Sequence, residues 1–349
     1  MIICEGVAVK AEDQPFVPFS FERRDPLPHD VDIDILFCGI CHSDLHAARN
    51  EWSRTVYPCV PGHEIVGRVR SIGSAVTRYK TGDLVGVGCM VGSCRICEHC
   101  RSGLEQYCLT GCIMTYNSPD AETGEGRHTF GGYSKRIVVN EDFVLRIPDN
   151  LDPAAVAPLL CAGITTYSPL RHWQAKPGMK IGVIGLGGLG HMAIKIGHAM
   201  GAEMTLFTTS SGKKEDALRL GAQQVVLSRD SEEMNRVVRS LDLIIDAVGV
   251  EHDINAYLAT LKMNGTIVQI GLPGAPFAVN ARSLISARRS FAGSFIGGIV
   301  ETQEMLDFCS QHNFAADVEI ISAKEIDTAY ERMLKADVKY RFVIDMATL

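Results

Sequence analysis

The chain has 349 residues, with 34 lysines and arginines against 41 aspartates and glutamates, and a formal net charge of -7. This length exceeds one ordinary hydrophobic core and predicts two domains, with a site in the cleft between them. The acidic balance and the lack of a basic run argue against nucleic acid or an anionic membrane surface as a partner. The amino terminus has no extended apolar core, so we expect a cytoplasmic protein without an export signal.

The first part of the chain, up to about residue 147, alternates β-rich apolar runs with turn residues. This pattern predicts an irregular, largely antiparallel β domain with long functional loops. The expected strands are 31–37, 65–72, 84–88 and 133–139. The next segment, 153–170, predicts a helical crossover that carries Cys161.

From Lys180 onward, short strands rich in Val and Ile alternate with segments of helix length. This rhythm predicts a parallel, doubly wound sheet of an α/β protein, with strands at 181–184, 204–208, 224–227, 243–246 and 266–270. After about residue 295 the pattern predicts helices at 301–311 and 323–335 and a strand at 340–346. We expect this tail to pack back onto the first domain.

Four cysteines fall in one Gly-rich lobe with the spacing C-x2-C-x2-C-x7-C: Cys94, Cys97, Cys100 and Cys108. Four thiolates in so short a loop can close a tetrahedron around zinc, which predicts a structural zinc site. Iron–sulfur ligation is the first alternative, but its usual spacings place the fourth cysteine differently and often follow it with proline, whereas Leu109 follows here. Free or disulfide-paired thiols are the second alternative.

A second set of possible metal ligands is scattered along the chain: Cys41, His63 with its neighbour Glu64, and Cys161. Two thiolates and one imidazole are three protein ligands, and they leave a fourth position for water or a substrate oxygen. The scatter alone proves little, because a lone histidine or cysteine is often simply structural.

A glycine motif, Gly185-Leu186-Gly187-Gly188-Leu189-Gly190, follows an expected strand and opens an expected helix, as a dinucleotide site requires. An acidic residue about 20 positions on would favour NAD, and none is present. The corresponding segment carries hydroxyls and two cations and predicts NADP instead; it contains Thr209, Ser210, Ser211, Lys213 and Lys214. The alternative is that Ser211 only caps the helix and that Glu215 and Asp216 balance the lysines.

These motifs occur in the order seen in zinc-containing medium-chain alcohol dehydrogenases, and the chain resembles that family through essentially its whole length. The strings 57–64, 158–163 and 293–297 resemble the cinnamyl alcohol dehydrogenase branch. The resemblance implies a GroES-like, zinc-binding catalytic domain at 1–161 and 296–349, and a Rossmann NADP-binding domain at 162–295. It also implies two zinc ions per chain, a homodimer, and interconversion of primary alcohols and aldehydes.

The resemblance assigns a role to each residue of the open metal site. Cys41, His63 and Cys161 would bind the catalytic zinc, while Glu64 would approach the metal during ligand exchange. Around them, Asp44 would orient His63, Ser43 would contact the substrate oxygen, and His46 would release the proton to solvent. For Ser43 and His46, hydrogen bonding within the loop is the alternative.

The resemblance also places cofactor and substrate contacts. Ser210, Ser211 and Lys214 would bind the 2′-phosphate, Thr165 the nicotinamide, and Arg341 the pyrophosphate, unless Arg341 is an outward-facing strand residue. An apolar cleft for the aldehyde would be lined by residues that could equally be core: Trp52, Cys89, Met114, Phe295 and Ile296. Because Met114 stands where lignin-pathway members tend to carry an aromatic residue, we expect broad aldehyde reduction. A zinc polyol dehydrogenase and a non-catalytic zinc protein are the competing hypotheses.

Overall fold

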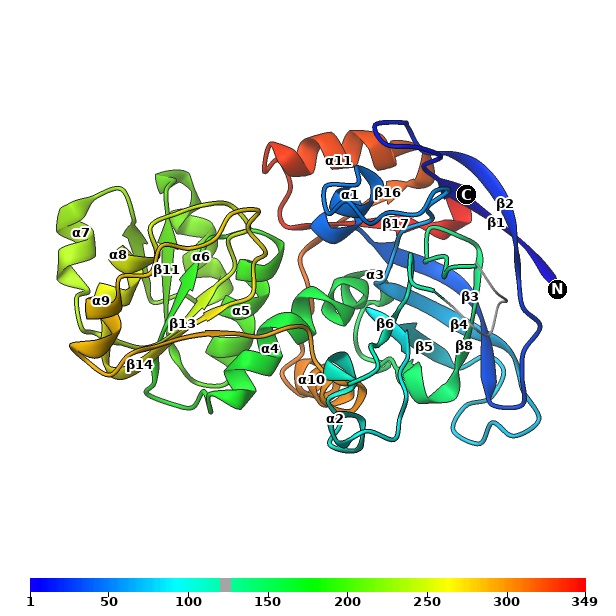
Figure 1. The fold of residues 1–349 in the computed structure, drawn as a ribbon, viewed down its shortest axis with the longest axis horizontal. Coiled ribbons are helices and arrows are strands. Elements are labelled where there is room, and N and C mark those ends of the chain that lie inside the picture. Colours follow the sequence, from blue (N-terminus) through cyan, green and yellow to red (C-terminus); the bar gives the residue numbers. More distant parts are fainter. Residues whose placement is uncertain (120–126) are drawn as a thin grey trace. The chain divides into compact units, whose positions relative to one another are not determined.

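The computed structural model describes residues 1–119 and 127–349, and these divide into two compact units. The first unit is Met1–Ile164 with Gly297–Leu349, and the second is Thr165–Ile296 (Figure 1). Among the described residues, no helix is both long and apolar enough to cross a membrane.

The first unit is built on a seven-stranded sheet whose central strand is β3 (Asp30–Gly39). Strand β3 pairs antiparallel with three neighbours, and most of its side chains are buried. The other strands are β4 (Ile65–Ile72), β5 (Leu84–Val87), β8 (Arg136–Asn140), β9 (Leu145–Arg146), β16 (Val318–Ser322) and β17 (Arg341–Asp345). A separate antiparallel hairpin, β1 (Ile2–Ala8) and β2 (Val17–Arg23), was not among the expected strands.

The C-terminal segment belongs to this first unit. Strand β17 pairs antiparallel with β3, with Val343 opposite Gly39, and β16 extends the sheet parallel to β17 (Figure 1). The segment also contains α10 (Ile299–Gln311) and α11 (Ile326–Leu334). The tail therefore packs onto the first domain, as the sequence predicts.

The expected crossover helix is interrupted. The chain forms α3 (Pro153–Val156), then a 3-10 turn (Ala157–Leu160), and resumes as α4 (Ala162–His172). Between them, Cys161 has φ −129° and ψ −67°, which lies outside helical geometry. A single helix through this segment is thus wrong, and Cys161 stands at the break.

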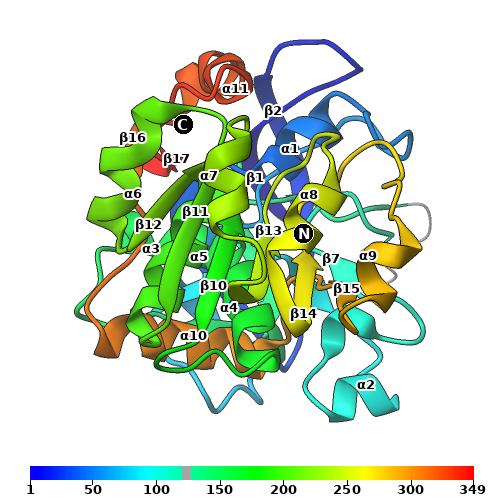
Figure 2. The same cartoon turned by 90° about the vertical axis from the view of Figure 1, so that its left-hand side faces the viewer.

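The second unit is a six-stranded sheet in which every pairing is parallel (Figure 2). Its strand order is β12-β11-β10-β13-β14-β15, which is the doubly wound arrangement of a Rossmann fold. The strands are β10 (Lys180–Ile184), β11 (Glu203–Thr208), β12 (Gln224–Leu227), β13 (Leu241–Asp246), β14 (Leu261–Gln269) and β15 (Ser290–Gly293). The sequence predicts the first five, whereas the short edge strand β15 was missed.

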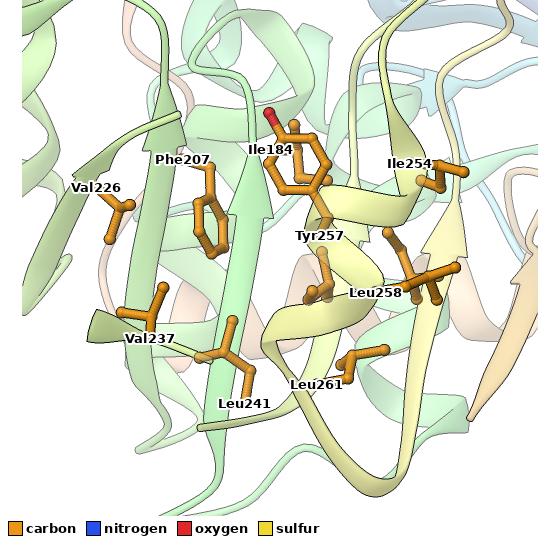
Figure 3. Packing of buried hydrophobic residues seen from close by; sticks show 11 residues of the cluster. Ile184, Phe207, Val226, Val237, Leu241, Ile254, Tyr257, Leu258 and Leu261 are labelled. Atoms are coloured by element: carbon orange, nitrogen blue, oxygen red, sulfur yellow. The ribbon is translucent and has the colours of Figure 1, made fainter. Parts of the chain in front are cut away.

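The helices of the second unit are α5 (Gly188–Ala199), α6 (Lys214–Leu220), α7 (Ser231–Arg236), α8 (Ile254–Thr260) and α9 (Ala281–Ile285), after α4. A buried apolar cluster joins the helix α8 to the sheet, with the rings of Phe207 and Tyr257 edge to face at 5.3 Å (Figure 3). This core fixes the carboxyl ends of β10, β11 and β13, where ligands bind in folds of this kind.

Candidate active site

A buried cluster of metal-binding side chains lies within the first unit. It consists of Cys41, His63, Glu64 and Cys161, whose ligand atoms all lie within 4.8 Å of one another. The Sγ atoms of Cys41 and Cys161 are 3.9 Å apart. A tetrahedral zinc with Zn–S bonds of about 2.3 Å requires a sulfur–sulfur edge of about 3.8 Å, so the two thiolates fit a shared zinc ion.

Each member of the cluster lies at the end of an element or at a break. Cys41 is the N-cap of α1 (His42–Ala48) directly after β3, and His63 and Glu64 immediately precede β4. A Cβ at position 39 would lie 2.0 Å from Oε2 of Glu64, so the glycine at this position leaves room for the carboxylate. Local chain geometry therefore makes room for these donors before any metal binds.

The carboxylate of Asp44 fixes the orientation of the His63 imidazole through its Nδ1 atom. Asp44 is fully buried, and its Oδ1 lies 3.1 Å from Nδ1 of His63 and accepts the Gly62 amide N–H at 3.1 Å. Its Oδ2 accepts the Cys41 amide N–H at 2.8 Å and the Tyr133 hydroxyl at 3.4 Å. Burial acts to lower the pKa of His63, but the Asp44 charge outweighs it and raises this pKa. With Nδ1 held as the donor to Asp44, Nε2 is the nitrogen that can bind a metal.

Glu64 and Arg341 form an ion pair beside the cluster. Arg341 donates to Oε1 of Glu64, and both residues are buried. Among the residues that the structure describes, the other carboxylate oxygen, Oε2, has no hydrogen-bond partner although it is buried. Burial raises the pKa of Glu64 to about 7. An unpartnered buried oxygen next to two thiols and an imidazole fits a group that approaches a cation. For Arg341, the outward-facing alternative is wrong, since only 5% of the residue is exposed.

The residues expected to move the proton lie on α1. Ser43 and His46 are three positions apart on this helix and therefore share one face. His46 is partly exposed, its Nδ1 contacts the carboxylate of Glu51, and its ring lies 5.2 Å from that of Trp52. The structure thus brings Trp52, an expected substrate contact, next to His46.

The other expected substrate contacts are distributed between the two units. Cys89 is buried in the first unit, and its thiol interacts with that of Cys161. Met114 lies on β7 (Ile113–Met114), opposite Met90 of β6 (Met90–Gly92). Phe295 is 47% exposed and Ile296 is buried, and both belong to the second unit.

Tyr116 and Tyr133 are neighbours of the metal cluster that sequence reasoning missed. The ring of Tyr116 lies 5.7 Å from that of His63, and Tyr133 contacts Asp44. Burial raises the pKa of both phenols well above the ordinary value, so both stay neutral near pH 7. No motif marks either tyrosine; the only signal is that Tyr116 follows Met114 by two positions.

The cysteine quartet forms the second cluster. The four sulfurs lie within 4.8 Å of one another, with 3.9 Å between Cys94 and Cys100 and 3.5 Å between Cys97 and Cys100. Backbone N–H groups of Cys97 and Cys94 point at the sulfurs of Cys94 and Cys108, each at 3.4 Å. None of the four forms a disulfide, so only the free-thiol half of the second alternative remains beside the zinc site. Their spacing suits one tetrahedral zinc, and the helix α2 (Glu98–Arg101) lies between the second and fourth ligands.

The glycine motif lies between β10 and α5 in the second unit. Gly185 has φ +87°, and a Cβ on Gly190 would lie 2.0 Å from the Gly185 carbonyl oxygen, so this turn requires glycine at both positions. Gly187 is the N-cap of α5, next to Gly188, and no atom of the described residues comes within 4 Å of the place of a Cβ. There is therefore room beside the start of α5, and the free amide N–H groups of a helix start suit a pyrophosphate.

The segment after β11 carries no acidic side chain at the expected position. Thr209, Ser210, Ser211 and Lys214 are exposed there, as are Gly212 and Glu215. Lys213 donates from Nζ to the Leu186 carbonyl oxygen at 2.9 Å and so ties this segment to the glycine motif, a contact that sequence reasoning missed. Hydroxyls and a cation at this edge fit a 2′-phosphate. Thr165 is buried in α4, one turn after Cys161.

Comparison with known proteins gives the family. Residues 27–149 match the model of the alcohol dehydrogenase GroES-like domain, and residues 188–311 match that of the zinc-binding dehydrogenases. An aldehyde reductase of Escherichia coli, YahK, is 56% identical over 349 residues, with 99% of each chain covered. A cinnamyl alcohol dehydrogenase of Sorghum bicolor is 44% identical with a TM-score of 0.96 over 99% of this chain and 98% of that one. The enzyme CAD of Helicobacter pylori, solved with NADP(H), is 42% identical with a TM-score of 0.93 over 99% of both chains.

The chain therefore belongs to the zinc-binding, medium-chain alcohol dehydrogenase family. The predictions of the GroES-like and Rossmann folds, of zinc and NADP as cofactors, and of alcohol–aldehyde oxidoreduction are confirmed.

Proposed function

We propose that this chain reduces a broad range of aldehydes to primary alcohols with NADPH, and catalyses the reverse reaction, at the cluster of Cys41, His63 and Cys161. The observation that carries the proposal is the buried set of two thiols and one imidazole. The neighbouring Glu64 carboxylate forms an ion pair with Arg341. Three ligands leave one position for a substrate oxygen. A zinc ion bound there supplies Lewis acidity, which stabilises negative charge on that oxygen.

The side chains around this position handle the proton. The Ser43 hydroxyl gives a proton to the oxygen of the aldehyde that receives the hydride, and takes it back in alcohol oxidation. His46 connects Ser43 to solvent, because the two residues share one face of α1 and His46 is partly exposed beside Glu51. Meanwhile Asp44 keeps the His63 ring in one tautomer.

The NADP(H) site extends along the carboxyl edge of the second unit's sheet. Gly185, Gly187, Gly188 and Gly190 admit the pyrophosphate, while Arg341 stays paired with Glu64 in the first unit. The 2′-phosphate is bound by Ser210, Ser211 and Lys214, with Thr209 beside them, and Thr165 contacts the nicotinamide. Support comes from the exposed hydroxyls and from Lys214 at the start of α6, which can bind a phosphate although Glu215 and Asp216 lie in the same first turn.

The aldehyde is held by apolar side chains, and the specificity is broad. The proposed contacts are Trp52, Cys89 and Met114, all in the first unit. Met114 is flexible and partly buried, with the Cys112 thiol 3.7 Å from its sulfur, so this wall adapts to substrates of different width.

The assembly is a cytoplasmic homodimer that pairs through the second unit. Strand β15 ends the six-stranded sheet, and an unpaired edge strand is a template for a second copy. Large exposed apolar side chains lie in this unit as well: Ile285 at 80%, Met263 at 71% and Leu272 at 66%. A reducing compartment accords with twelve cysteines that are all free.

The test measures zinc per chain and NADPH oxidation with benzaldehyde and aliphatic aldehydes, and the reverse reaction with sorbitol. We expect two zinc ions, and a loss of kcat/KM of more than about 100-fold in Cys161→Ala. The matched control is Cys309→Ala, which removes another buried thiol, on α10. Full activity of Cys161→Ala, or turnover of polyols with NAD alone, would overturn the proposal. A protein with two zinc ions and no turnover would be the non-catalytic alternative.

A further inference from the structure

A buried histidine–aspartate pair lies at the carboxyl end of β13. Asp246, the last residue of this strand, is fully buried, and its Oδ2 is 2.8 Å from Nε2 of His252. The other ring nitrogen, Nδ1, is 2.9 Å from the Val250 carbonyl oxygen. A carboxylate and a carbonyl can only accept, so both contacts are hydrogen bonds only when both ring nitrogens carry hydrogen. The geometry therefore favours the positively charged imidazolium over either neutral tautomer.

This pair closes the loop that follows β13. The second oxygen of Asp246 accepts the Val248 amide N–H at 3.1 Å, so one carboxylate holds both the start of the loop and His252 at its end. The rings of Phe277 and Tyr257 lie 5.2 and 5.7 Å from that of His252 and limit the access of water to it. The loop is thus organised around a charge pair rather than around regular secondary structure.

The loop supports the glycine motif directly. A Cβ on Gly185 would lie 2.8 Å from Cγ2 of Val248, and one on Gly271 would lie 2.3 Å from the Val248 carbonyl oxygen. Val248 is therefore packed between Gly185, the first glycine of the motif, and Gly271, which lies two residues after β14. The side chain of Val248 therefore borders the turn at Gly185, and a displacement of Val248 changes the packing against this turn.

The position of the loop in the sheet explains why this contact concerns the cofactor. Strand β10 lies between β11 and β13, so the chain order reverses at β10 and β13. Ligands of doubly wound sheets bind at the carboxyl ends of the two strands where this reversal occurs. The glycine motif after β10 forms one side of that position, and the loop after β13 forms the other.

We propose that His252 is a positioning residue for NADP(H): its charged ring, held by Asp246, fixes Val248 against the glycine motif and makes cofactor affinity depend on pH. The inference rests on the proposed use of this edge as the NADP(H) site, and it adds a residue outside the phosphate and nicotinamide contacts.

The sign of the pH dependence follows from the groups around the ring. The hydrogen bond to Asp246 raises the pKa of His252 above its ordinary value, burial opposes this, and the contact with Val250 and the charge of Asp253 add to it. Tyr257 stays neutral, because burial raises its pKa. A raised pKa means that the stabilising contacts are complete below the ordinary value of about 6.5 and are lost as pH rises through the raised value. Above it, one ring nitrogen turns a lone pair toward an acceptor, and the affinity for NADP(H) falls.

The experiment measures NADPH binding rather than turnover, by fluorescence titration between pH 7 and 9.5. The variant His252→Gln is compared with His198→Gln, which removes an exposed histidine of the same unit. We expect the wild-type Kd and that of His198→Gln to rise by about 10-fold over this range, as the loss of a hydrogen bond to a charged group implies. In His252→Gln, the Kd should be about 10-fold higher at pH 7 and nearly constant, with KM for NADPH raised and kcat preserved.

Three outcomes would each overturn the inference without touching the proposed function: a wild-type Kd that does not change with pH, equal pH profiles in wild type and His252→Gln, or a fall in kcat alone. Failure of the wild type to bind NADPH at any pH would instead refute the proposed function. An NMR titration of the His252 ring in the wild-type protein gives a second readout that does not depend on the variant folding. A pKa at or below the ordinary histidine value there would refute the inference as well.

Discussion

The substitution Asp44→Asn tests how much the orientation of the His63 imidazole contributes to zinc binding, because it leaves His63 itself in place. Asp44 is fully buried, and each of its two oxygens accepts two donors: Gly62 and His63 at Oδ1, Cys41 and Tyr133 at Oδ2. Asparagine has nearly the same shape but replaces one oxygen with an NH₂ group, which is a donor. In either orientation of the asparagine amide, its NH₂ group faces N–H or O–H groups, which are donors and cannot accept its hydrogens.

The magnitude follows from these contacts. If the NH₂ group takes the place of Oδ1, Nδ1 of His63 must become an acceptor, and the proton moves to Nε2, the nitrogen that we propose binds zinc. If it takes the place of Oδ2, the Cys41 amide loses its partner, and the charge of Asp44 is lost in both cases. Removing such a partner behind a metal ligand costs about 10- to 100-fold in metal affinity or activity, or about 1.4 to 2.7 kcal/mol.

The assay is a chelator titration that follows loss of the catalytic zinc, together with kcat/KM for benzaldehyde. Asp32→Asn is the matched control, because Asp32 is equally buried but pairs with Arg136 in the sheet. It should lower the free energy of unfolding without changing zinc affinity. If Asp44→Asn keeps zinc affinity and kcat/KM within about two-fold of wild type, the reasoning about the tautomer is refuted.

Three further predictions concern the glycine motif, cofactor choice and the cysteine lobe. Gly190→Ala should cost about 1–3 kcal/mol of stability, because its Cβ would lie 2.0 Å from the Gly185 carbonyl oxygen. Gly187→Ala, with open space at that position, should unfold like wild type but bind NADPH more weakly; equal thermal stability of the two variants would contradict this. Lys214→Ala should raise the Kd for NADPH about 10-fold and leave that for NADH unchanged, and an equal change for both cofactors would exclude a 2′-phosphate contact. Cys100→Ala should lose one zinc per chain and more than about 2 kcal/mol of stability in denaturant unfolding, whereas retention of both zinc ions would show that three thiolates suffice.

Local sequence signals predicted the parts of this protein whose structure depends on neighbours in the chain. The strands β10 to β13 are short apolar runs between turn residues, and the motif at Gly185 lies where one of them ends. The cysteine quartet was predictable because its ligands fall within 15 residues, so that spacing alone limits the geometry. Edge elements were less visible: β15 has four residues and only partly buried side chains.

Contacts between distant segments could not be read from the sequence. Tyr133 meets Asp44 across 89 positions, and Arg341 meets Glu64 across 277. The break at Cys161 also escaped prediction, because Ala and Leu around it favour a helix and only the fold requires the interruption. Burial and pairing in the assembled sheet decide these positions, and no local pattern records them.

The cysteine lobe also determines where α10 begins, which gives its metal a role beyond the lobe itself. Glu105, between the third and fourth cysteines, accepts the amide N–H of Ile299, the first residue of α10, at 3.1 Å. Gly298, the N-cap, has no side-chain cap of its own, and a Cβ there would lie 1.8 Å from the Gly103 carbonyl oxygen. Because a helix start needs a partner for its free N–H groups, a carboxylate from the lobe acts as the missing cap, and such a cap contributes about 1 kcal/mol. Release of the zinc would loosen Glu105 and Gly103 together, so the first turn of α10 should lose order with the lobe rather than independently of it.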